Sequence, residues 1–133
     1  MKVTYAATLS GALFAFIVSP AWAQDSKDWV DIKDAEALRA LFSDKTHRSR
    51  AYVAHYRADG QGILLSKGSD IRHARTWQLK GGDQVCAGPK GDTPTCYRYQ
   101  RSTKNPAEVL ATGELRGQRV MLWFTVEDGI PKF

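Results

Sequence analysis

Cysteine is scarce in this sequence: it occurs twice in 133 residues, as Cys86 and Cys96. The pair lacks the Cys-x-x-Cys spacing common in redox dithiols, and no histidine lies near either thiol, as a zinc site usually requires. The three histidines, His47, His55 and His73, do not have metal-ligand spacing either. The sequence therefore predicts no metal site.

Catalytic signatures are also missing. The chain contains no G-x-S-x-G turn and no phosphate-binding P-loop. Distant residues can still assemble into a catalytic triad, so an unrecognised hydrolase remains one of three functional hypotheses. No catalytic residue and no cofactor is predicted.

Long apolar runs are absent except at the N-terminus. Lys2 supplies a positive charge, an apolar run follows from about residue 6 to residue 18, and Ala21-Trp22-Ala23 resembles a signal-peptidase site. The run is shorter than the roughly 20 residues that span a bilayer. We therefore expect residues 1–23 to be a cleaved signal peptide, with no transmembrane anchor after cleavage. The remaining chain, 24–133, is expected to be a single β-rich domain in the periplasm or secreted.

Turn-forming residues separate the two cysteines, in the segment Gln84 to Gln100. In an oxidising compartment, this arrangement predicts a disulfide between Cys86 and Cys96. Alternation along the second strand puts Tyr97 and Tyr99 on the face opposite Cys96. If the tyrosines face the core, the disulfide crosses a hairpin on its outer face.

Periodicity predicts one helix followed by strands. Residues 34–42 have apolar side chains at i, i+3, i+4 spacing (Leu38, Leu41 and Phe42), with Asp34 as the N-cap. Apolar alternation and turn signals, including Asp59-Gly60, then recur. The predicted strands are 51–57, 62–66, 75–80, 84–87, 95–101, 108–115 and 118–127. This pattern indicates an all-β antiparallel meander that forms a small lipocalin-like barrel or a sandwich, with one short N-terminal helix.

The last of these strands is apolar on both faces, because Met121 and Trp123 alternate with Leu122 and Phe124. Such a strand is usually covered. We expect the helix at 34–42 to cover it; a ligand pocket is the alternative.

Positive charge exceeds negative charge. Without residues 1–23, which include Lys2, the chain has 18 Lys and Arg (19 minus one) and 14 Asp and Glu, a net charge of +4. Such a surface attracts anionic envelope components, although an ordinary solvated basic surface is the alternative. Export argues against nucleic acid as a partner.

Five segments together give a resemblance: LRALFSDKT, YVAHYRADGQG, RTWQLKGGDQVC, CYRYQR and FTVEDGIPKF. In this order they resemble a proteobacterial family of small exported proteins classed as a domain of unknown function, family 995 of that series. The resemblance covers residues 29–133 and implies an envelope location, a compact β-rich fold and shared framework positions. It implies no activity.

Aromatic side chains are the candidate binding residues of the first functional hypothesis, a non-catalytic binding module for a small amphiphilic ligand or an anionic envelope component. These residues are Tyr52, Tyr56, Trp77, Tyr97, Tyr99 and Trp123. The second hypothesis is a protein–protein interaction or inhibitor module that acts through its loops, near residues 44–50 or 87–95.

Overall fold

The computed structural model describes residues 28–131, so the expected signal peptide at 1–23 lies outside the described residues. One helix and nine strands follow in chain order: β1 (Trp29–Ile32), α2 (Ala35–Phe42), β2 (Lys45–Arg48), β3 (Tyr52–Tyr56), β4 (Gln61–Ser66), β5 (Arg72–Lys80), β6 (Gln84–Pro89), β7 (Thr95–Ser102), β8 (Glu108–Leu115) and β9 (Gln118–Asp128). The predicted all-β class with one short N-terminal helix is confirmed.

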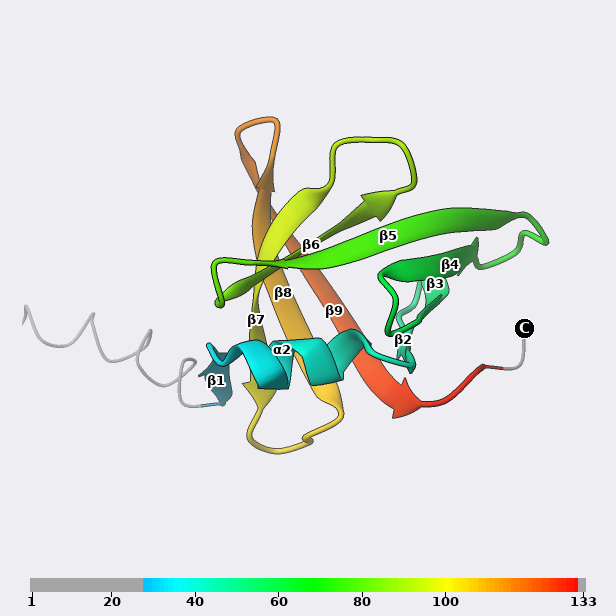
Figure 1. The fold of residues 1–133 in the computed structure, drawn as a ribbon. Helices are drawn as coiled ribbons and strands as arrows, with labels where there is room; N and C mark the ends of the chain where they lie inside the picture. The colour runs from blue at the N-terminus through cyan, green and yellow to red at the C-terminus, as the bar shows by residue number, and fades with distance from the viewer. Residues whose placement is uncertain (1–27, 132–133) are drawn as a thin grey trace, which may run out of the picture.

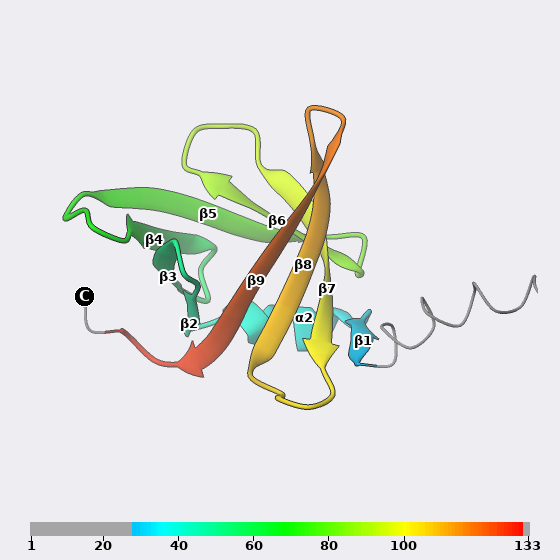
Figure 2. The same ribbon diagram turned by 180° about the vertical axis from the view of Figure 1, so that it is seen from behind.

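The strands form a closed antiparallel barrel. Each strand from β2 to β8 pairs with the next one along the chain, and β2 also pairs with β9, which closes a ring of eight strands (Figures 1 and 2). The ninth strand, β1, pairs with residues 99–102 of β7, beyond the part of β7 that pairs with β6. The lipocalin-like barrel predicted from the turn spacing is therefore the observed architecture.

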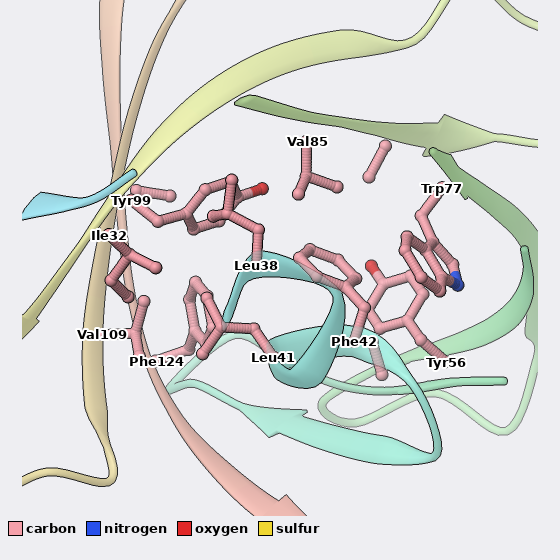
Figure 3. Close-up of a cluster of buried hydrophobic side chains, with 13 residues drawn as sticks. Ile32, Leu38, Leu41, Phe42, Tyr56, Trp77, Val85, Tyr99, Val109 and Phe124 are labelled. Atoms are coloured by element: carbon pink, nitrogen blue, oxygen red, sulfur yellow. The ribbon is translucent and has the colours of Figure 1, made fainter. Parts of the chain in front are cut away.

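The helix α2 lies across one end of this barrel and inserts its apolar face (Figures 1 and 3). Asp34 caps it, because its carboxylate accepts the backbone N–H of Ala37 at 3.1 Å. Leu38, Leu41 and Phe42 are fully buried among the inward-facing side chains of the strands. The barrel core is thus shared between the sheet and the helix.

The expectation that this helix covers the outer face of β9 is wrong. Met121 is 55% exposed and Trp123 is 58% exposed, whereas Phe124 is 4% exposed. Because successive side chains of a strand point to opposite faces, Leu122 and Phe124 face the interior and their apolar neighbours face outward. The helix packs against the inner face instead.

The two cysteines form the predicted disulfide, and they lie directly opposite each other in the β6–β7 pair. Val85 and Tyr97 are also paired, on the inner face, so the disulfide lies on the outer face as expected. Cys86 is nevertheless buried.

Two strands, β1 and β2, were not predicted from the sequence. Each has four residues, and neither WVDI nor KTHR shows apolar alternation over a useful length. Between residues 28 and 131, no helix is long and apolar enough to span a bilayer.

Candidate functional site

The aromatic residues selected from the sequence divide between the inside and the outside of the barrel. Trp123 lies on the outer face of β9, where its ring meets that of Trp29 at a centroid distance of 5.7 Å. The other five belong to the hydrophobic core or pack against it: Tyr52, Tyr56, Trp77, Tyr97 and Tyr99. The structure brings these five together and separates Trp123 from them.

Side chains fill the part of the interior that lies next to α2. The Phe42 ring is at its centre, with ring-centroid distances of 4.7 Å to His47, 4.9 Å to Tyr56, 5.1 Å to Trp77 and 5.8 Å to Tyr99. Figure 3 shows the helix presenting this ring to the surrounding strands. A ligand has to bind elsewhere, because this part is packed protein.

A groove opens in the wall of the barrel beside β9. The strand β2 pairs with residues 125–128 of β9, whereas residues 118–124 of β9 pair only with β8. The groove of about 850 Å³ lies between this part of β9 and the turn that joins β2 to β3. We call it the β9 groove; its apolar lining comes from Ala51, Tyr52, Met121, Leu122, Trp123 and Phe124.

Charged side chains surround the β9 groove. Arg48 binds Glu127 through two contacts of 3.2 Å, so its charge is locally neutralised. Arg50 and Lys67 also line the groove and form no ion pair with another residue of the range 28–131. The carboxylate among the lining residues is that of Glu108. The rim therefore has a small excess of positive charge.

Arg75 is a cation on the inner face of β5. It pairs with Gly62 of β4 and Pro89 of β6, and it shares its face of β5 with the core residue Trp77, two positions along. Its Nε is buried and has no hydrogen-bond partner among the described residues, and no described carboxylate forms an ion pair with Arg75. Arg75 as a whole is only partly buried, but a buried donor atom without a partner is costly to a fold, so this Nε–H group requires an explanation.

The charge of Arg75 acts on three tyrosines of the barrel interior. Burial, with a smaller effect of Tyr56 in the same direction, raises the pKa of Tyr52 to about 12, and the charge of Arg75 opposes this shift. Burial likewise raises the pKa of Tyr97 and, more strongly, that of Tyr99, and Arg75 again opposes the shift. These hydroxyls therefore remain protonated at neutral pH and are available as hydrogen-bond donors.

One hydroxyl–imidazole pair occurs near the C-terminal segment, but it is poorly placed for nucleophilic catalysis. The Thr46 hydroxyl lies 3.2 Å from Nδ1 of His55 and donates to the carbonyl of Gly129 at 2.6 Å. Because the hydroxyl proton is engaged by Gly129, the imidazole cannot act as its base in this arrangement. Thr46 is also fully buried. The pair holds the C-terminal segment against the barrel.

Arg75 was not predicted as a site residue, although a signal was present: Arg75, Trp77 and Leu79 share one face of the strand. The groove residues Arg48 and Arg50 were not singled out either. Among the described residues, no group of three or more His, Cys, Asp and Glu side chains is arranged to hold a metal ion.

Comparison with known proteins identified no relative. No protein-family model matches this chain, and no curated protein and no solved structure is significantly similar to it.

Proposed function

We propose that this protein is a non-catalytic binding module of the bacterial envelope, and that it holds a small anionic amphiphile in the β9 groove. One observation carries the proposal: the groove is lined by the partly buried Tyr52 and Leu122, beside Arg50 and Lys67, which form no ion pair with another described residue. Its volume of about 850 Å³ lies in the range of about 300–1,000 Å³ typical of small-molecule sites. An apolar chain would lie along these side chains.

An extracytoplasmic location is part of this proposal. The Cys86–Cys96 disulfide supports it, because structural disulfides persist mainly in oxidising compartments. The expected signal peptide at 1–23 and the resemblance to a family of exported proteins point the same way, and both stay predictions.

Calorimetric titration of the purified, oxidised protein with dodecanoate tests the groove. We expect Ala51→Trp to weaken binding at least about tenfold, because an indole ring at Ala51 fills part of the groove. The matched control is Ala58→Trp, in the exposed turn between β3 and β4, which should leave affinity unchanged. No binding of dodecanoate or dodecyl phosphate by the unmodified protein, or equal binding by the two variants, would overturn the proposal.

A second candidate function is protein interaction through strand addition. The edge of β9 from residue 118 to residue 124 has no partner strand on the groove side among the described residues. An extended peptide can pair with such an edge and place alternate side chains in the adjoining groove. This candidate revises the expectation of a loop-mediated interaction, since only residues 48–50 of the two expected loop regions line the groove.

Hydrogen exchange distinguishes the two candidates. A bound peptide strand would slow exchange of the groove-side amides in residues 118–124, because it forms backbone hydrogen bonds with them. A bound amphiphile has no backbone groups to offer and would leave most of these amides exchanging as before.

A further inference from the structure

We propose that Arg75 is an anion-binding residue inside the barrel, and that its guanidinium group pairs with the carboxylate or phosphate of the ligand whose apolar chain occupies the β9 groove. This inference rests on the proposed function and deepens it by naming the chemical group that the interior recognises. It assigns Arg75 a binding role that the exposed cations of the rim do not share.

The first argument is the position of Arg75. The Arg75–Gly62 pair stands beside the Gly62–Tyr56 pair, so one row on the inner face runs Tyr56, Gly62, Arg75. Gly62 has no side chain, and the ring of Tyr56 lies over it: a Cβ added at Gly62 would be 2.7 Å from a ring carbon of Tyr56. Arg75 is therefore the next inward-facing position of this row after the buried Tyr56 and the small Gly62, and it is only partly buried.

The second argument is the cost of leaving Arg75 unpaired. In residues 28–131, its Nε is the one buried side-chain nitrogen or oxygen without a hydrogen-bond partner. An unsatisfied buried donor destabilises a fold, and more so when the group is charged. A carboxylate or a phosphate removes this cost, because its oxygens match the planar fork of donors on a guanidinium group.

The third argument is the set of neutral donors around Arg75. Its charge lowers the pKa of Tyr52, Tyr97 and Tyr99, against the larger upward effect of burial, so these tyrosines lie within its electrostatic range. The Tyr52 hydroxyl makes no hydrogen bond with another described residue, so it can donate to an anion held by Arg75. The protein supplies several donors here and, among the described residues, no competing ion pair.

The fourth argument is continuity with the β9 groove. Tyr52 lines the groove and also lies within the electrostatic reach of Arg75. We infer that a ligand whose chain lies along Leu122 directs its anionic group past Tyr52 toward Arg75. Arg50 and Lys67, at the rim, would instead act on the rate of association and its dependence on salt.

Two amphiphiles of equal length, dodecanoate and dodecanol, test the inference by calorimetry. In the unmodified protein we expect dodecanoate to bind at least about tenfold more tightly than dodecanol. Arg75→Gln should abolish this preference and leave dodecanol affinity within about twofold. The control Arg50→Gln/Lys67→Gln should keep the preference for dodecanoate over dodecanol. It should weaken the salt dependence of dodecanoate binding. Dodecyl phosphate, run in parallel, shows whether carboxylate or phosphate is preferred.

A second measurement follows Arg75 itself. The Nε–H resonance of Arg75 in a ¹H–¹⁵N spectrum, assigned by its loss in Arg75→Lys, should shift on addition of dodecanoate and stay in place with dodecanol. Binding of dodecanoate without this shift, or an unchanged preference in Arg75→Gln, would overturn the role of Arg75 and leave the groove proposal intact.

If neither amphiphile bound, the groove proposal would fail, and titration with inorganic phosphate would decide the role of Arg75. A saturable shift of the same Nε–H resonance would support anion binding, and its absence would refute it. The thermal midpoint of ligand-free Arg75→Met is a further check: we expect it to equal or exceed that of the unmodified protein, because the variant removes a buried donor that has no partner among the described residues. A midpoint several degrees lower would show that Arg75 is structural.

Discussion

At the scale of single residues, His47 connects the helix to the barrel. Its Nε2 lies 2.7 Å from the carbonyl of Leu41 near the end of α2, so the neutral ring donates a hydrogen bond to it. Its ring also stacks on Phe124 at a centroid distance of 4.4 Å. Burial lowers the pKa of His47 to about 4, the Leu41 hydrogen bond opposes that shift, and the charge of Arg75 adds to it.

This shift predicts a pH-dependent stability. Between about pH 4 and pH 6.5 the unfolded chain binds a proton at His47 that the folded protein does not bind. Stability is therefore fully present above the unfolded pKa and falls as the pH drops through this window, by up to about 3 kcal/mol. Urea denaturation at a series of pH values measures the effect.

Two substitutions test this assignment to His47. His47→Gln removes the titrating group and keeps a hydrogen-bond donor, so its stability should change less between pH 7 and pH 4.5. His73→Gln, at an exposed position of β5, should retain the slope of the unmodified protein. Equal slopes in all three proteins would show that another group is responsible.

Sequence reasoning reached most of the buried aromatic residues, because strand alternation identifies one face at a time. Trp123 was grouped with these residues because its strand is apolar on both faces, so alternation alone does not tell which face points inward. The placement of Phe124 inside and Trp123 outside depends on register against β8, where Phe124 is opposite Val109 and Trp123 is opposite Leu110. No local pattern within the strand specifies that register.

At the scale of elements, the β6–β7 hairpin combines a covalent link with a turn-rich loop. Cys86 and Cys96 occupy opposed positions and close a loop with a sequence separation of 10 residues. Gly91, at φ +93°, adopts in this loop the left-handed conformation that glycine favours. The hairpin also supplies Val85 and Tyr97 to the interior, so its register positions part of the core.

Removing the disulfide should lower the stability of the protein. We expect the double substitution Cys86→Ala/Cys96→Ala to reduce the free energy of unfolding by about 3 kcal/mol, because the unfolded chain regains the entropy of an open loop. Denaturation of the variant, compared with the oxidised protein with and without reductant, measures this loss. A variant as stable as the oxidised protein would contradict the expectation.

The elements that could be predicted are those with a strong local period. The helix at 34–42 has a cap and an apolar face, and the later strands alternate between turns. The strands β1 and β2 form because partners at 99–102 and 125–128 are present, so they depend on residues far along the chain. Tertiary pairing, and not local propensity, creates them.

At the scale of the whole molecule, the barrel is closed by a short seam. Four residue pairs join β2 to β9, whereas eight pairs join β8 to β9. The seam carries two ion pairs, Lys45 with Asp128 and Arg48 with Glu127, and such solvent-accessible pairs contribute little. The open part of the wall above this seam is the β9 groove, so the place of the candidate site follows from incomplete closure.

Hydrogen exchange of the ligand-free protein should reveal this asymmetry. Residues 109–113 of β8 pair on both edges, with β7 and with β9, and should exchange slowly. Residues 118–124 of β9 pair on one edge, so amides that point toward the groove should exchange much faster than those that point toward β8. Uniform slow exchange along residues 118–128 would show that the seam extends further in solution.

The pairing of β2 with β9 also has a consequence for biosynthesis. The ribosome makes residues 45–48 long before residues 125–128, and the ring of strands cannot close until both are present. The helix α2, whose apolar side chains pack in the barrel core, is synthesised earlier still. Its complete packing surface forms only when the last strand has been made. Contacts so distant along the chain slow folding, so the nascent protein remains an open polypeptide for most of its synthesis. An unfolded chain is the form that a narrow secretion channel accepts.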